Sequence, residues 1–235
     1  MARYRPLIVW LIILTVILGG GYIVDKKVPN QHLPWRALNV EAPTGFATRA
    51  QLMRMSVSPS SVCQAAAIGA DNLNSIPANP REANTPCGWK VARLVYGSET
   101  ATLKPGEASM QCPLAIGTYI WMREIDRLAT EHLGSGLNNI HHYGTYSCRR
   151  QNGNSSGRWS EHAFANAWDI ASFELQDGRI ISVLKDWDGD KDRQRFLRGV
   201  RDEACNIFRV TLSPDYNAAH ADHFHVDMGP SRSCR

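Results

Sequence analysis

An apolar run from Leu7 to Val24 constrains this chain more than any other feature. At about 18 residues the run is just long enough to span a bilayer as a helix. Arg3 and Arg5 precede it, which favours a cytoplasmic N-terminus and export of everything that follows; Lys26 and Lys27 on the far side weaken this charge asymmetry but do not reverse it. A cleaved signal peptide is the competing interpretation, but residues 19–21 are three glycines that make a poor cleavage site. We therefore expect residues 1–24 to be retained as a membrane anchor.

The cysteines also indicate export. All six lie after the apolar run, and none forms a Cys-x2-Cys pair of the kind that binds zinc through thiolates. Disulfides form and persist in oxidising compartments, so we expect three of them, and the sequence does not choose among their pairings. A reduced cytosolic protein is the alternative. The cysteines are Cys63, Cys87, Cys112, Cys148, Cys205 and Cys234.

Length and composition predict one domain of ordinary size. The chain has 235 residues, of which 43% are hydrophobic and 20% charged, enough to bury a substantial core. Residues 25–60 are rich in proline and polar residues and are predicted to be a tether, and residues 61–235 a single domain. The net charge of +4 is mild and spread out, so nucleic acid is not an expected partner, whereas an anionic polymer would be attracted.

Two amphipathic segments predict the main helices. One runs from Cys112-Pro113 to about Leu133, with Gly134 as its stop, and the other from about Asp190 to Phe208. Apolar β-prone runs and a hairpin turn at Asp177-Gly178 predict strands around them. We expect an α+β fold in which a small antiparallel sheet packs against the two helices.

Three of the eight histidines are clustered near the C-terminus. Side chains on an extended strand alternate between its two faces, so His223 and His225 point the same way. His220 can join them if the chain bends just before the strand. Three imidazoles this close together indicate a metal site or proton transfer.

A second motif supplies further candidate ligands. His162 is followed seven residues later by Asp169, at the entry to an apolar run that is typical of a strand. Hydrolytic zinc sites take three protein ligands and leave one position for water, so these two residues and one imidazole of the C-terminal cluster would complete a site on the sheet. His141 and His142 are adjacent and therefore face opposite ways on a strand, which favours structural or surface roles over metal binding.

The acidic run from Asp186 to Asp192 lacks the glycine and glutamate spacing of a calcium loop. Its residues are instead expected to favour the start of the following helix, where the helix dipole stabilises negative charge.

Five motifs in order resemble a known family. The pair His-x6-Asp followed by His-x2-His-x-His is similar to the zinc D-Ala-D-Ala carboxypeptidase and murein endopeptidase superfamily, which shares its metal site with lysostaphin-type peptidases and hedgehog domains. More closely, the chain resembles the bacterial extensin-like C-terminal domain family over roughly residues 60 to 235. The motifs are Tyr146-Ser-Cys-Arg149, Ser160-Glu-His162, Ala167-Trp-Asp169-Ile, Ala204-Cys205 and His220-x2-His-Phe-His225-Val-Asp227.

The resemblance implies roles for individual residues. It makes His162, Asp169 and His225 the ligands of zinc (Zn2+) and places His223 beside the metal, where it would steady the transition state. His220 falls at the position of the general base, where some relatives have glutamate.

Two further residues are implied to contact the substrate. Arg149 occupies the place of an arginine that in carboxypeptidase relatives contacts the substrate carboxylate or the polarised carbonyl, and Ser160 opens the motif that contains the first ligand.

The resemblance also implies a function. We expect a zinc peptidase, either a carboxypeptidase or an endopeptidase, anchored in the bacterial inner membrane with its domain in the periplasm. Its partners would be the peptide stems or cross-links of peptidoglycan. Two alternatives remain open: a cell-wall binding or structural domain with the same fold and no turnover, and a zinc amidase that cuts the bond between sugar and peptide.

Overall fold

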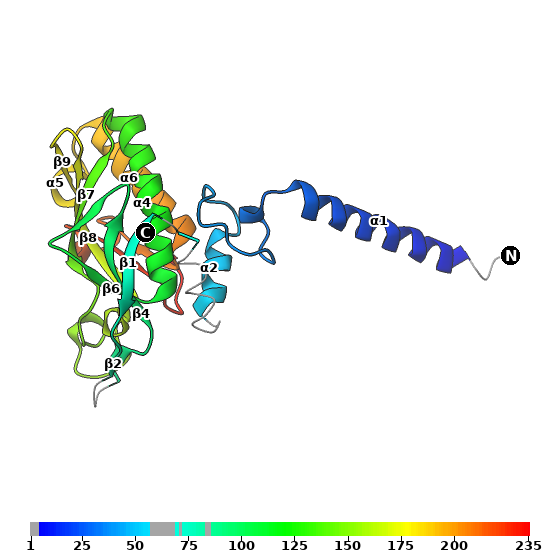
Figure 1. The fold of residues 1–235 in the computed structure, drawn as a ribbon, viewed down its shortest axis with the longest axis horizontal. Helices are drawn as coiled ribbons and strands as arrows, with labels where there is room; N and C mark the ends of the chain where they lie inside the picture. The colour runs from blue at the N-terminus through cyan, green and yellow to red at the C-terminus, as the bar shows by residue number, and fades with distance from the viewer. Residues whose placement is uncertain (1–4, 57–68, 71, 83–85) are drawn as a thin grey trace.

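The computed structural model describes residues 5–56, 69–70, 72–82 and 86–235. This part of the chain comprises an N-terminal helix, a connecting segment and a mixed domain in which two long helices cover one face of a large β-sheet (Figure 1). The N-terminal helix leads away from the domain on its helical side.

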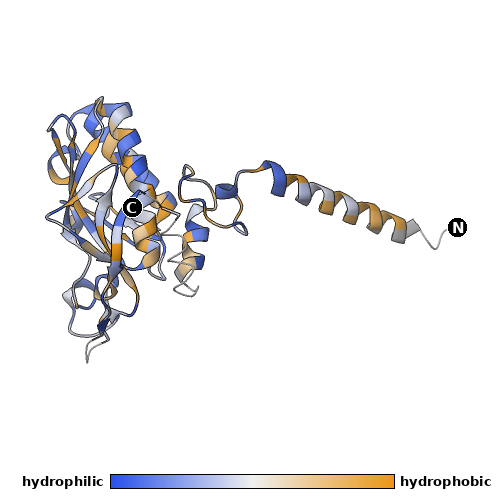
Figure 2. Ribbon diagram, in the orientation of Figure 1, coloured by the Kyte–Doolittle hydropathy of each residue, from blue (hydrophilic) through white to orange (hydrophobic). Residues whose placement is uncertain are grey.

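Helix α1 (Arg5–Lys27) confirms that the N-terminal apolar run is helical. Residues Ile8–Lys27 have a mean hydropathy of 2.2, and 0% of them are buried against the rest of the protein. Figure 2 shows hydrophobic residues along most of this helix and hydrophilic ones at its C-terminal end. By length and composition, α1 can therefore cross a membrane.

The segment after α1 is more ordered than a tether. It contains the short helices η2 (Asn30–His32) and α2 (Thr48–Ser56) and packs against the domain. Val40 and Leu52 are buried in the main core, and the Arg123 guanidinium donates to the Val40 carbonyl at 2.8 Å. We call residues 28–56 the collar. The prolines that indicated a tether alternate with apolar residues, and burial of these apolar residues in the domain core holds the segment against the domain.

Both long helices were correctly predicted, because their end signals are local. Helix α4 (Cys112–Leu133) begins with proline in its first turn and ends at Gly134, whose left-handed conformation lets its N–H reach the Thr130 carbonyl at 3.1 Å. Helix α6 (Lys191–Ile207) is capped by the Asp190 carboxylate, which accepts from two backbone N–H groups. A short helix, α5 (Val183–Asp186), precedes α6.

The sheet is larger than the small antiparallel sheet that we expected. Ten strands of the described chain join in the order β1-β4-β5-β7-β8-β11-β10-β12, with β6 beside β4 and β9 beside β8. Most pairings are antiparallel, but β5–β7 and β10–β12 are parallel, and α4 lies in the crossover from β5 to β7. The strands are β1 (Leu73–Ala78), β4 (Ala92–Ser98), β5 (Thr102–Lys104), β6 (Ala108–Met110), β7 (Leu137–Gly144), β8 (Ala167–Leu175), β9 (Ile180–Ser182), β10 (Val210–Leu212), β11 (Phe224–Asp227) and β12 (Ser233–Cys234). A separate two-stranded sheet pairs β2 (Arg81–Glu82) with β3 (Gly88–Trp89).

The core lies between the sheet and the two long helices. Trp121 of α4 packs edge-on against Trp168 of β8, with ring centroids 6.1 Å apart. On β11, Phe224 and Val226 belong to the same buried core. Because side chains alternate along a strand, Asp169 and His225 are directed to the opposite face of the sheet. The packing of the core thus places the candidate metal ligands on the face that the long helices leave open.

Disulfides fasten the periphery of the domain. Cys205 at the end of α6 is bonded to Cys234 on β12, and Cys87 to Cys148 in the segment after β7. Cys112 is also disulfide-bonded, and none of the described cysteines is free, whereas Cys63 lies outside the described residues. By constraining the unfolded chain, such bridges typically contribute about 2–4 kcal/mol each.

Candidate metal centre

Two neighbouring strands bring a carboxylate and an imidazole face to face. Strands β8 and β11 are antiparallel, and their register puts His225 directly opposite Asp169. Directly opposite residues project from the same face of a sheet, so the two side chains meet. His225 Nδ1 lies 2.9 Å from Asp169 Oδ1.

The third residue comes from the turn that precedes β8. His162 lies in the helical turn η4 (Glu161–Phe164), where the Ser160 hydroxyl accepts from the His162 N–H at 3.3 Å. Ala165 ends the turn in a left-handed conformation, with φ 53°. The turn folds the buried His162 ring over the strand, so that its Nε2 lies 3.1 Å from Asp169 Oδ2 and 3.2 Å from His225 Nδ1.

The outward nitrogens of both imidazoles are held by oxygen acceptors. His162 Nδ1 lies 3.3 Å from the Thr145 carbonyl, and His225 Nε2 lies 3.1 Å from Asp227 Oδ2. Neither oxygen can donate, so each outward nitrogen carries the proton and, in a neutral ring, each inward nitrogen carries a lone pair. Two lone pairs and a carboxylate therefore converge on one point, an arrangement that is able to hold a cation.

The spacing of the donor atoms is close to that of a zinc site. Tetrahedral zinc at about 2.0–2.1 Å from each ligand separates the ligand atoms by about 3.3 Å. Here the two inward nitrogens are 3.2 Å apart, and each faces a different oxygen of Asp169: His162 Nε2 lies 3.1 Å from Oδ2, and His225 Nδ1 lies 2.9 Å from Oδ1. Two imidazoles and one carboxylate are also a donor set that suits zinc, and hydrogen bonds to the outer nitrogens are the usual way to orient metal-binding histidines. Among the described residues this is the one such His/Asp group.

The pKa values of His225 and Asp169 in the metal-free protein also indicate that the cluster favours a positive charge. Burial alone would lower the pKa of His225, but its hydrogen bonds to Asp169 and Asp227 outweigh burial and raise that pKa to about 9. Burial would likewise raise the pKa of Asp169, but the contacts with His162 and His225 hold it well below its usual range. In the absence of metal, a proton on His225 therefore balances the carboxylates.

His220 lies beside this cluster at the end of the turn η5 (Ala218–His220). Its ring centroid is 5.1 Å from that of His223 and 6.0 Å from that of His225. Its Nδ1 lies 2.7 Å from Asn217 Oδ1, an acceptor, so its Nε2 carries the lone pair. Burial, followed by repulsion from His223 and His225, lowers the pKa of His220 to about 4 and keeps the ring neutral at neutral pH.

His223 also lies at the edge of the cluster. Its Nδ1 donates to Asp222 Oδ1 at 2.7 Å, while its Nε2 lies 3.8 Å from Asp169 Oδ1. Tyr143 donates its hydroxyl proton to the other oxygen of Asp222 at 3.2 Å, which holds this carboxylate in place.

The two candidate substrate-binding residues occupy different environments. Arg149 is exposed, and its carbonyl accepts the Ser160 N–H at 3.1 Å, so its backbone lies against the turn that carries His162. Ser160 is buried, and its hydroxyl caps that turn.

The two adjacent histidines of β7 lie outside the cluster. His141 pairs with Glu174 at 3.1 Å, and His142 is buried with its Nε2 3.3 Å from the Gly106 carbonyl.

Three residues around the site were not predicted from the sequence. Asp227 and Thr145 hold the outward nitrogens of the two candidate histidine ligands, and Asp222 holds His223. A local signal for Asp227 was available, since it lies two residues after His225 and therefore on the same face of the strand. Thr145 acts through its carbonyl, which any residue would supply, so no side-chain pattern could reveal it.

Fold and site together define a mixed α/β domain with a candidate His/Asp/His metal centre on one face of its sheet. Residues 61–235 match the family described as extensin-like protein C-terminus, and the chain belongs to this family. This confirms the resemblance of the motifs to the extensin-like family. No curated protein and no solved structure matches the chain.

Proposed function

We propose that this protein is an exported, membrane-anchored zinc peptidase that hydrolyses the peptides of bacterial peptidoglycan. One observation carries the proposal: the inward nitrogens of His162 and His225 converge with the Asp169 carboxylate, and the outward nitrogen of each ring is held by an acceptor. When bound, zinc supplies Lewis-acid chemistry, because it polarises a peptide carbonyl and makes water acidic enough to lose a proton near neutral pH.

His220 is the residue best placed to accept that proton. Asn217 fixes its Nδ1 as a donor, which leaves Nε2 free to act as a base on the water that attacks the peptide carbonyl. Its lowered pKa keeps it neutral, and therefore able to accept a proton, at neutral pH.

His223 would serve the developing negative charge on the carbonyl oxygen. Its Nδ1 is bonded to Asp222, so its Nε2 can donate a hydrogen bond to that oxygen only when both ring nitrogens carry a proton. Arg149, exposed beside the His162 turn, would contact a carboxylate of the substrate, and Ser160 would act mainly by keeping the turn in shape.

Three features support the proposed cellular location. The length and hydropathy of α1 support an anchor in the inner membrane, and the disulfides support a domain in an oxidising compartment, the periplasm. Arg3 and Arg5 before the apolar run favour this orientation, although Lys26 and Lys27 after it weaken the charge asymmetry.

The test is digestion of purified sacculi with the zinc-loaded full chain, followed by mass analysis of the products. A peptidase releases fragments cut within the peptide stems or cross-links, whereas an amidase releases whole stems from the sugar. The Asp169→Ala variant serves as the matched inactive control. Products cut between sugar and peptide, or none above that control despite bound zinc, would refute the proposal in favour of an amidase or a binding domain respectively.

A further inference from the structure

The last turn of α1 is fastened directly to the collar. Asp25 accepts from the Trp35 indole at 3.0 Å and from the Arg36 Nε at 2.8 Å. The helix ends at Lys27, and the next short helix, η2, begins only three residues later at Asn30. If α1 spans a bilayer, the collar must therefore lie at the membrane surface, because no flexible linker separates the collar from α1.

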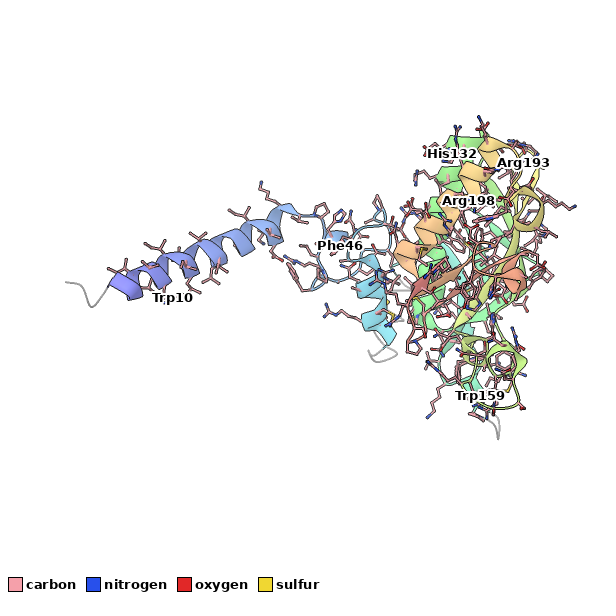
Figure 3. All side chains as sticks on the ribbon, turned by 180° about the vertical axis from the view of Figure 1, so that it is seen from behind. Trp10, Phe46, His132, Trp159, Arg193 and Arg198 are labelled. Atoms are coloured by element: carbon pink, nitrogen blue, oxygen red, sulfur yellow. A yellow bond between two sulfur atoms is a disulfide. The ribbon has the colours of Figure 1, made fainter. Side chains whose placement is uncertain are left out.

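The collar exposes large aromatic side chains at this level. Trp35 is 57% exposed and Phe46 is 91% exposed, while Tyr22 in the last turns of α1 is 66% exposed. Figure 3 places Phe46 on the collar, between α1 and the domain. Tryptophan and tyrosine concentrate where a membrane meets water, because their rings have an apolar body and a polar edge.

Positive charge lies at the same level. Lys26 and Lys27 end α1 and are exposed, so their ammonium groups can reach lipid phosphates while their stems stay along the helix.

The collar is in turn fixed to the helical layer of the domain. Arg49 donates to the Cys205 carbonyl at 2.6 Å, and the Thr44 hydroxyl donates to Glu203 Oε2 at 3.0 Å, both acceptors being on α6. On α4, Tyr119 donates to Glu41 Oε1 at 2.6 Å. Whatever holds the collar therefore also fixes the orientation of the domain.

The candidate metal centre lies on the far side of the molecule from the collar. The layers succeed one another in the order α1, collar, long helices and sheet (Figure 1). Trp168 and Phe224 face the core on the helical side, and the alternation of side chains along β8 and β11 directs Asp169 and His225 to the opposite face. Helices and sheet thus separate the collar from the site.

We propose that the collar is a membrane-seating surface: Trp35 and Phe46 enter the headgroup region of the bilayer that α1 spans, and the metal centre is thereby held facing away from that bilayer. The inference rests on the membrane-anchoring part of the proposed function and not on its catalytic part. It also narrows the class of substrate, because a site that faces away from the bilayer acts on polymer that lies beyond the membrane and not on a precursor still attached to lipid.

Hydroxyl-radical footprinting of the full chain in phospholipid vesicles tests this arrangement. The oxidation rate of each side chain, divided by its intrinsic reactivity, reports its contact with water. We expect Trp35 and Phe46 to be protected several-fold relative to Tyr143 and Tyr216, which are exposed beside His223 and His220 on the site face. Acetylation of Lys26 and Lys27 should slow when anionic lipid is added, while that of the exposed Lys185 should not.

Each other outcome overturns the proposal. Equal rates at Trp35, Phe46 and the two tyrosines would mean that the collar does not touch lipid. Protection that disappears when the protein is diluted with lipid would identify a second copy of the chain as the occupant. Protection of the tyrosines would mean that the site faces the bilayer. The measurement requires neither zinc nor turnover, so its failure would leave the proposed chemistry standing, and an inactive protein could still pass it.

Discussion

Replacing Asp227 by Asn tests whether the metal centre depends on the proton position in His225. Asp227 Oδ2 accepts from His225 Nε2 at 3.1 Å, and its other oxygen accepts the Gly229 N–H at 2.8 Å. Asparagine has only one acceptor oxygen. If that oxygen stays on Gly229, the amide NH2 faces His225 and pushes the ring proton to Nδ1, where the metal should bind. If the amide turns round, the buried Gly229 N–H loses its partner.

The first of these outcomes weakens zinc binding and the second weakens the fold. Loss of a partner that orients a metal-binding histidine typically costs about 10- to 100-fold in metal affinity. That factor corresponds to about 1.4–2.8 kcal/mol of binding free energy. An unsatisfied buried N–H costs about 1–3 kcal/mol of folding free energy. Zinc affinity, measured by competition with a coloured chelator, and thermal unfolding of the metal-free protein separate the two.

Asp222→Asn is the matched control. Asp222 makes a similar bond, 2.7 Å long, to His223, which we do not assign as a ligand. We expect this variant to bind zinc as tightly as the unchanged protein. A folded Asp227→Asn protein with unchanged affinity would refute the proton argument, and an equal loss in Asp222→Asn would make His223 a ligand.

Three further predictions concern the same site. Asp169→Ala removes the anionic ligand and leaves two imidazoles, so elemental analysis should find little zinc in the purified variant, and an undiminished content would contradict the ligand assignment. In the metal-free protein the pKa of His225 is raised to about 9, so below that pH zinc must displace a proton from this ring. The affinity of the protein for zinc, measured by titration, should therefore rise by about tenfold per pH unit and level off above the pKa. An affinity that does not depend on pH would contradict this prediction. His220→Ala should keep zinc but lose about 10²- to 10⁴-fold in turnover of muropeptides, and His220→Glu should restore part of it; loss of zinc in His220→Ala would show that His220 is a ligand.

Sequence reasoning succeeded where the signals are local. The ends of α4 and α6 are set by residues within or next to each helix, namely Pro113, Gly134 and Asp190. The same holds for the hairpin at Gly178, whose φ of 85° explains why glycine stands there. His223, directly before β11, and His225 on it lie on the same side, as the sequence predicted, since both approach Asp169.

The sheet and the collar could not be predicted in the same way. Strands β5, β6, β9 and β10 have only three residues each, which is too short for an alternating pattern to stand out. The collar is ordered by partners such as Arg123 and Glu203, which lie far away in sequence. The geometry of the candidate site combines both kinds of information: the motifs supplied the residue types, but the pairing of His225 with Asp169, 56 positions apart in sequence, depends on the register of two strands.

The last prediction concerns what zinc does for the fold. Asp169 and His225 are held by strand pairing, and His162 by a capped turn, so the frame of the site is independent of any ion. Without metal, the carboxylates are balanced by the proton that the raised pKa of His225 retains. Chelation should therefore reduce the free energy of unfolding only by the binding free energy of zinc, with a matching drop in melting temperature. Unfolding should stay cooperative, unlike that of small zinc domains, which unfold without their metal.

Near-UV circular dichroism reports this directly, because Trp121 and Trp168 pack together in the core behind the site. Loss of that signal on chelation would mean that the ion, and not the sheet register, holds the three ligands together.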